Sequence, residues 1–189
     1  MSSGRRRHAA LAAALAVLIV MLVGAPPATP ADKVLDDLLF DLQMVPLEGK
    51  TPAPFTLERL ADGQKVSLAD HQGSPMFIYF WATWCPYCAK ELPSTIAQVQ
   101  REYRDQGLVV YAVNIEEGKR TVGSWVEKNK LTLPVLLDPP GDASGAYQVT
   151  ATPTVYLIGR DGKLVAKALG TKPWTSEQGR ALLSYLVKR

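Results

Sequence analysis

The sequence of 189 residues is 47% hydrophobic and 21% charged, which suits one globular domain with a core and a short appendage. Its formal net charge is +3, and three consecutive arginines at residues 5–7 carry a charge of that size. The rest of the chain is therefore nearly neutral, which argues against a nucleic-acid-binding protein.

Residues 1–31 are predicted to be a secretory signal or an N-terminal membrane anchor. Arginines 5–7 precede an apolar run from Ala9 to Ala25, the order of charge and hydrophobicity found in export signals. The run of about 17 residues lies at the short limit for crossing a bilayer, and the arginines favour a cytoplasmic N-terminus. Cleavage after Ala31 is the alternative to an anchor, but nearby prolines make that site poor. In both cases the rest of the chain is predicted to lie outside the cytoplasmic membrane.

Residues 32–50 are predicted to form an amphipathic pre-domain helix and a linker. Between Asp32 and Met44, five apolar side chains recur at helical spacing: Val34, Leu35, Leu38, Leu39 and Leu42. The favoured interpretation is that this helix packs against the chain's own domain. Binding to a partner protein or to a membrane are the alternatives, and Asp36, Asp37 and Asp41 disfavour an anionic lipid surface.

The domain at residues 51–189 is predicted to open with a β-hairpin. Two short strand patterns, Phe55–Leu57 and Lys65–Ser67, flank Asp62-Gly63. An Asp-Gly pair between two strand patterns is a strong signal for a tight hairpin turn.

A buried strand and an amphipathic helix bracket the only two cysteines of the chain. The strand is the apolar run at residues 75–80, and helical spacing of apolar residues extends over residues 86–105. Free backbone N–H groups and the helix dipole stabilise a thiolate at a helix N-terminus, and the first thiol of a Cys-x-x-Cys helix has a lowered pKa. Cys85 is therefore predicted to be the exposed nucleophile and Cys88 the shielded resolving thiol.

Other uses of the cysteine pair are less favoured. A structural disulfide closing so small a loop would restrict the unfolded chain little. A zinc site needs more ligands, and only His8 and His71 are available to supply them. Covalent haem attachment needs a histidine directly after Cys88, where the chain has Ala89.

The remainder of the chain alternates between strand and helix patterns. The predicted elements are strands at 108–113, 133–137, 155–158 and 164–169 and helices at 121–129, 143–147 and 176–188. A right-handed parallel crossover from the strand at 75–80 to the strand at 108–113 would bring Asn114 to Glu117 to the same sheet edge as Cys85. Either Glu116 and Glu117 shape the electrostatic potential there, or they are ordinary loop charges; the second interpretation is favoured.

The chain resembles the thioredoxin superfamily in two motifs, Trp84-Cys85-Pro86-Tyr87-Cys88 between a strand and a helix and the later Thr152-Pro153-Thr154. It is most similar to the TlpA/ResA/CcmG-type extracytoplasmic thiol–disulfide oxidoreductases, which share the first hairpin and the additional helix–strand pair. The resemblance covers residues 51–189. It implies an α/β fold, a thioredoxin-like three-layer sandwich with a mixed central sheet, an N-terminal β-hairpin and an inserted helix–strand pair.

This resemblance implies how the dithiol meets its substrate. Pro153 would be a cis proline facing the dithiol, where it helps to exclude metal. Thr152 would present its backbone to the substrate, and Trp84, Pro86 and Tyr87 would contact the substrate around the cysteines.

The resemblance also draws attention to an acidic group. Thioredoxins usually have a buried aspartate six residues before the first cysteine, where this chain has Tyr79. Glu91, three residues after Cys88 on the same helix face, is similar to a glutamate regarded as functional in the ResA/CcmG-type branch. It is predicted to be a partly desolvated carboxylate that exchanges protons with the thiols; a solvated helix charge is the alternative. Pro93 should kink this helix, since it cannot donate a backbone hydrogen bond.

The leading functional hypothesis is a protein-disulfide reductase outside the cytoplasmic membrane, with no cofactor and no metal. The resemblance implies a disulfide-containing protein substrate, with apocytochrome c as the suggested class, and a membrane electron donor of the DsbD/CcdA type. The alternatives are a disulfide oxidase or isomerase of secreted proteins and, in a different class, a redox-inert binding module. A peroxiredoxin is disfavoured, because Ile78 and Ala82 occupy positions where its motif requires proline and threonine.

Overall fold

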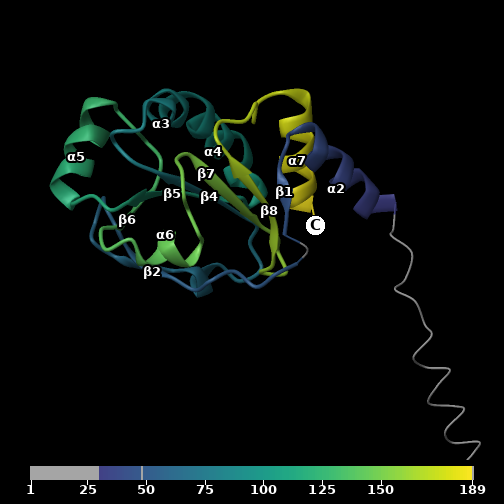
Figure 1. Cartoon of the computed structure of the whole chain (residues 1–189), viewed down its shortest axis with the longest axis horizontal. Helices are drawn as coiled ribbons and strands as arrows, with labels where there is room; N and C mark the ends of the chain where they lie inside the picture. Colours follow the sequence, from purple (N-terminus) through teal and green to yellow (C-terminus); the bar gives the residue numbers. More distant parts are fainter. Residues whose placement is uncertain (1–29, 48, 189) are drawn as a thin grey trace, which may run out of the picture. The chain divides into compact units, whose positions relative to one another are not determined.

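The computed structural model describes residues 30–47 and 49–188 (Figure 1). The predicted signal or anchor at residues 1–31 lies outside the described residues except for its last two. Among the described helices, none has both the length and the apolar character needed to cross a membrane.

One mixed sheet organises the described domain, with strand order β1-β8-β7-β4-β5-β6-β2-β3. The strands are β1 (Val45–Pro46), β2 (Thr56–Arg59), β3 (Lys65–Ser67), β4 (Met76–Trp81), β5 (Val109–Ile115), β6 (Val135–Asp138), β7 (Thr154–Ile158) and β8 (Leu164–Leu169). Strands β4, β5 and β6 are parallel neighbours. Strand β7 is antiparallel to both β4 and β8, and strand β2 is antiparallel to both β3 and β6. The predicted α/β fold with a mixed sheet and a first hairpin is confirmed.

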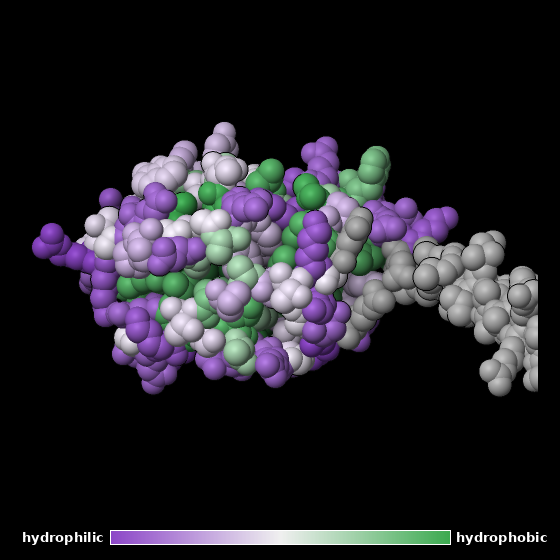
Figure 2. Space-filling view, turned by 60° about the horizontal axis from the view of Figure 1, so that its bottom comes forward, coloured by the Kyte–Doolittle hydropathy of each residue, from purple (hydrophilic) through white to green (hydrophobic). Residues whose placement is uncertain are grey.

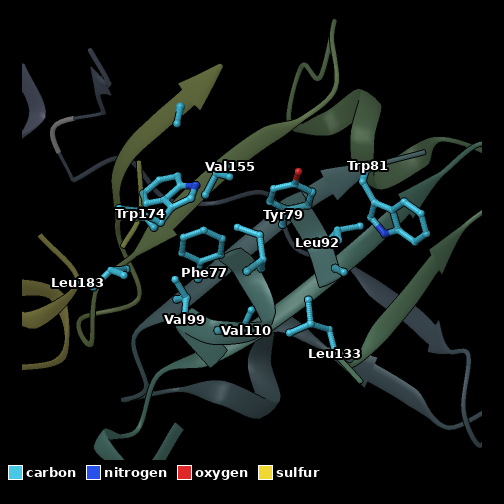
Figure 3. Packing of buried hydrophobic residues seen from close by; sticks show 14 of the residues in the cluster. Phe77, Tyr79, Trp81, Leu92, Val99, Val110, Leu133, Val155, Trp174 and Leu183 are labelled. Carbon is cyan, nitrogen blue, oxygen red and sulfur yellow. The ribbon is translucent and has the colours of Figure 1, made fainter. Parts of the chain in front are cut away.

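Strand β4 lies in the middle of the sheet, and all six of its residues are buried. Successive side chains of a strand point to opposite faces. Phe77, Tyr79 and Trp81 therefore enter one core cluster, whereas the alternate residues enter a second cluster on the other face. Figure 3 shows the first cluster, in which Trp174 meets Phe77 edge to face with ring centroids 4.8 Å apart. Two cores separated by the sheet make the three-layer arrangement.

Helices cover both faces of the sheet (Figure 1). The predicted helix at 86–105 is a continuous helical segment made of α3 (Pro86–Glu91), a π-helical turn η2 (Leu92–Ile96), α4 (Ala97–Tyr103) and a 3₁₀ turn η3 (Arg104–Gln106). The wider π turn contains Pro93, whose missing N–H and ring disturb the regular ladder. The structure shows a π turn at Pro93, and the predicted kink of the helix stays a prediction.

The other predicted elements are present with small shifts of their ends. They are the helices α5 (Lys119–Lys128), α6 (Asp142–Ala146) and α7 (Glu177–Lys188). The 3₁₀ turn η1 (Leu68–His71) was not predicted. Helix α5 and strand β6 form the inserted helix–strand pair, with β6 parallel to β5. Figure 2 shows one face of the molecule, on which hydrophilic and hydrophobic residues are interspersed.

The pre-domain helix is α2 (Pro30–Asp41). Leu39 and Leu42 are buried in the first core cluster, which agrees with packing against the chain's own domain. Val34 and Phe40 are exposed. Directly after this segment β1, which the sequence patterns did not predict, pairs antiparallel with β8.

Candidate active site

The two cysteines lie at the junction of β4 and α3 and form a disulfide. Cys85 is the N-cap residue of α3, with extended backbone angles, and Pro86 occupies the first helical turn, where its missing N–H is not needed. The backbone N–H of Cys88 donates a hydrogen bond to the Cys85 sulfur at 3.1 Å. This N–H group would also favour a thiolate on Cys85 once the disulfide is reduced.

Both cysteines are buried in this disulfide form. Cys85 is 2% exposed and Cys88 is fully buried, so the prediction of an exposed Cys85 is wrong for this form. The reason is that the loop before β7 covers the first sulfur: the carbonyl oxygen of Thr152 lies 3.6 Å from the Cys85 sulfur. Cys88 is covered more deeply, because it lies one turn inside α3 in the core cluster.

The loop that covers Cys85 contains the predicted cis peptide bond, between Thr152 and Pro153. Two hydrogen bonds fix its backbone: the Thr154 hydroxyl donates to the carbonyl of Ala151 at 2.7 Å, and the N–H of Gly170 donates to the carbonyl of Pro153 at 2.9 Å. Pro153 is buried and Thr152 is half-buried. A backbone carbonyl is thereby held beside the disulfide.

Three predicted substrate-binding residues surround the cysteines at the surface. Trp84 and Tyr87 are 68% and 66% exposed, and Pro86 between them is also exposed. Large exposed aromatic side chains are typical of protein-binding surfaces. The disulfide itself is therefore covered, while the three residues around it are exposed and available for contact with a protein.

Glu91 is buried on α3, only 6% exposed, so the alternative of a solvated helix charge is wrong. The hydroxyl of Tyr79 donates a hydrogen bond to its Oε2 at 2.8 Å, and the backbone N–H of Lys172 donates to its Oε1 at 3.4 Å. Burial raises the pKa of Glu91, and these two hydrogen bonds oppose that rise.

Glu117 lies at the predicted sheet edge, but it makes hydrogen bonds there that the sequence does not predict. Its carboxylate accepts hydrogen bonds from the Thr83 backbone N–H at 2.7 Å, from the Thr83 hydroxyl at 2.5 Å and from the Asn114 side-chain amide at 2.8 Å. The interpretation as an ordinary loop charge is therefore wrong for Glu117. Glu116 is exposed. The parallel register, in which Trp81 pairs with Asn114, confirms that the two strand ends share this edge.

The comparisons with known proteins agree with this geometry. The profile of the AhpC/TSA family matches residues 49–167. The chain belongs to this family. Its relatives include the thiol-disulfide oxidoreductase ResA of Bacillus subtilis, 36% identical over 124 residues that cover 66% of this chain and 68% of the relative. ResA of Bacillus cereus is 35% identical over 140 residues, 74% of this chain and 77% of the relative.

Solved structures of similar fold point the same way. A protein described as a DsbE-type thiol:disulfide interchange protein from Chlorobium tepidum matches with a TM-score of 0.63 and 30% identity, covering 71% of this chain and 96% of that one. StoA from Bacillus subtilis matches with a TM-score of 0.58 and 24% identity over 71% of this chain and 97% of that one, a similarity of fold. The predicted membership of the thioredoxin superfamily is confirmed, and the chain is a thiol–disulfide oxidoreductase.

Proposed function

We propose that the chain reduces protein disulfides outside the cytoplasmic membrane. The Cys85 thiolate attacks one sulfur of a substrate disulfide and releases the other substrate sulfur as a thiolate. The Cys88 thiolate then attacks the Cys85 sulfur in this mixed disulfide, which releases the second substrate thiolate and forms the Cys85–Cys88 disulfide. Two electrons pass to the substrate in each cycle, and an external donor returns two electrons to the disulfide.

The observation that carries this proposal is the placement of the disulfide. It joins the N-cap and the first turn of α3 and lies against a fixed carbonyl of the cis-proline loop. In the proposal, Thr152 and Pro153 hold the substrate backbone beside Cys85. Trp84, Pro86 and Tyr87 contact the substrate around the site, since they are exposed beside the covered disulfide.

Glu91 is proposed to exchange protons with the thiols. Cys88 must lose its proton before it can attack the mixed disulfide, and a buried carboxylate with a raised pKa suits a proton acceptor near neutral pH. An ionised Glu91 also disfavours a second negative charge on the dithiol. This property supports a reductant with specific partners, whereas DsbA-type oxidants strongly stabilise their reduced form.

The location and the partners are part of the same proposal. The arginine-flanked apolar run in residues 1–31 supports export, with either a cleaved signal or a membrane anchor, followed by a pre-domain helix and linker (32–50) and the enzyme domain (51–189). The protein would then act at the periplasmic or extracytoplasmic face of the membrane. Apocytochrome c is the proposed substrate class, and a membrane protein of the DsbD/CcdA type is the proposed electron donor.

A trapping experiment tests the proposed reaction. The Cys88→Ser variant lacks the thiol that resolves the mixed disulfide, so substrates should accumulate as covalent adducts on Cys85. Adducts are detected as bands that disappear on reduction and are identified by mass spectrometry. The matched control is Cys85→Ser, which keeps the buried thiol and should capture far less. Equal capture by both variants, or none by Cys88→Ser in cells where the native protein is active, would contradict the mechanism.

The alternative of a redox-inert binding module is wrong, because the chain is a thiol–disulfide oxidoreductase. One alternative is left within that class, and insulin reduction with dithiothreitol as the electron source separates it from the proposed reductase. A disulfide oxidase or isomerase would reduce insulin poorly and would have a reduction potential nearer to roughly −120 mV than to the roughly −270 mV of thioredoxin.

A further inference from the structure

Tyr79 shares a core cluster with the two cysteines and is hydrogen-bonded to Glu91. It lies on β4, six residues before Cys85, and its side chain projects into the first core cluster, which also contains both cysteines (Figure 3). The whole residue is buried. Its hydroxyl donates to Oε2 of Glu91 at 2.8 Å, so the strand is linked to a carboxylate one helical turn beyond Cys88.

A second contact completes the environment of the carboxylate. The backbone N–H of Lys172, in the segment between β8 and α7, donates to the other oxygen of Glu91 at 3.4 Å. Among the residues described, each oxygen of Glu91 therefore has one donor, from strand β4 and from the loop before α7 respectively. The Lys172 ammonium group donates a hydrogen bond at 3.1 Å to the carbonyl of Gln43, a residue in the segment after α2.

We propose that Tyr79 is a positioning residue for the reaction, holding the Glu91 carboxylate in one orientation beside the dithiol through its hydroxyl group. This inference rests on the proposed proton exchange between Glu91 and the thiols. It assigns to the tyrosine a task distinct from packing. The carboxyl group that works with the dithiol comes from α3, and β4 supplies the hydroxyl that orients it.

The chemistry of the pair supports this assignment. A phenolic O–H that donates to a carboxylate favours its ionised form, and such charge-assisted bonds are stronger than neutral ones. Burial raises the pKa of Glu91, and the Tyr79 hydrogen bond is the largest influence that lowers it. Burial and the neighbouring carboxylate also raise the pKa of Tyr79. The hydroxyl therefore remains protonated, and remains a donor, throughout the range in which thiols exchange.

Two hydrogen bonds reach the Glu91 carboxylate within the described part of the chain. Tyr79 faces it from β4, the backbone of Lys172 faces it from the segment before α7, and Cys88 lies on its own helix; Lys90 beside it on α3 is exposed. If the hydroxyl is removed, the 3.4 Å hydrogen bond from Lys172 is the one contact among residues 30–47 and 49–188 that still opposes the effect of burial on the pKa of Glu91. The carboxyl group should then hold its proton to a higher pH.

A purely structural role of Tyr79 makes a different prediction, and a second buried tyrosine provides the control. Tyr103 on α4 is a buried member of the same cluster, and its hydroxyl donates to the carbonyl of Arg180 at 3.1 Å. Tyr79→Phe and Tyr103→Phe each remove one buried hydroxyl and keep the ring. Both should lower stability, but only the first should change the titration of Glu91.

The experiment follows the Glu91 carboxyl carbon by ¹³C NMR in the disulfide form between pH 4 and 9, with the signal assigned by its loss in Glu91→Gln. The pH midpoint of the Glu91 titration should rise by about one pH unit in Tyr79→Phe, as expected when a charge-assisted hydrogen bond is removed. It should stay unchanged in Tyr103→Phe. The acidic limb of the pH–rate profile for insulin reduction should move by the same amount in Tyr79→Phe. Glu91→Gln should abolish that limb, and adding Tyr79→Phe to it should have no further effect on the profile.

The outcomes separate this inference from the function on which it rests. If Glu91→Gln abolishes the acidic limb but Tyr79→Phe leaves both the midpoint and the limb in place, Glu91 keeps its proposed role and the role of Tyr79 is overturned. If Glu91→Gln leaves the profile unchanged, proton exchange by Glu91 fails and the role of Tyr79 fails with it. Should Tyr79→Phe not fold, site-specific 3-fluorotyrosine at position 79 provides a more acidic donor. It should lower the midpoint, and an unchanged or raised midpoint would overturn the inference.

Discussion

Glu91 is an acidic residue in the protein interior, where charged side chains are uncommon. It is 6% exposed on α3, and carboxylates are seldom buried unless they are paired. The hydrogen bonds from Tyr79 and Lys172 account for its burial, because a buried carboxylate without donors would be costly. The spacing from Cys88 predicts that Glu91 lies beside the dithiol, but spacing along one helix cannot show which other elements cover it.

Replacing Glu91 by Gln is expected to change the pH dependence of stability in one direction. Burial raises the pKa of Glu91 above its usual 4.5 in the folded protein, so folding favours the protonated form. The stability that this preference contributes is complete below about pH 4.5 and is lost as the pH rises through the folded pKa. Glu91→Gln is neutral at every pH and should therefore gain stability relative to the native protein as the pH rises from 4 to about 7.5.

Urea unfolding of the disulfide forms at the two ends of this pH range measures the effect. Glu127→Gln, which removes an exposed carboxylate from α5, controls for the change in total charge. A stability difference between Glu91→Gln and the native protein that is the same at both pH values would contradict a raised pKa of Glu91.

At the scale of elements, the turn between β4 and α3 is held from the neighbouring strand. Parallel pairing brings the ends of β4 and β5 to one edge, with Trp81 opposite Asn114. Glu117 then reaches both the N–H and the hydroxyl of Thr83. The turn carries Trp84 and Cys85, so its position depends on a carboxylate that lies 34 residues away in the sequence.

Glu117→Gln should therefore loosen the active-site turn. The glutamine side chain has one acceptor oxygen and no charge, so it cannot accept all three hydrogen bonds, and those that it keeps are no longer charge-assisted. We expect a loss of about 1–3 kcal/mol in the free energy of unfolding and slower insulin reduction, because Trp84 and Cys85 lose a fixed support. Glu116→Gln, at the exposed neighbouring position, is the control and should change stability by less than about 0.5 kcal/mol. Equal effects of the two substitutions would show that Glu117 has no special part in the turn.

At the scale of the whole molecule, the sequence predicts the elements and their order better than the contacts between them. Apolar periodicity and turn residues identify the hairpin, β4, the helical segment after it and the inserted α5–β6 pair. Strand β1 was not predicted, because a strand of two residues is too short to show an alternation of apolar and polar residues. The contacts of Glu91 and Glu117 escape detection for another reason: each joins different elements, and no local pattern specifies which polar groups meet after folding.

The direction of electron flow is also a property of the whole molecule. A thermodynamic cycle links the reduction potential of Cys85–Cys88 to the difference in unfolding free energy between the disulfide and dithiol forms. The more reducing the native dithiol, the more stable the disulfide form is relative to the dithiol form. About 30 mV corresponds to about 1.4 kcal/mol, so the reductase and oxidase ends of the scale, about 150 mV apart, differ by about 7 kcal/mol in this quantity.

We expect the disulfide form to be the more stable one and the potential to lie nearer roughly −270 mV than roughly −120 mV. The physical reason is the buried carboxylate of Glu91, which adds unfavourable charge to a dithiol that ionises but leaves the uncharged disulfide untouched. Urea unfolding of both forms and equilibration with glutathione buffers measure the two quantities independently. Glu91→Gln should raise the reduction potential of Cys85–Cys88. It should also reduce the difference in unfolding free energy between the disulfide and dithiol forms. A native dithiol form that is more stable than the disulfide form would instead indicate an oxidase, since that order is the one found in DsbA-type oxidants.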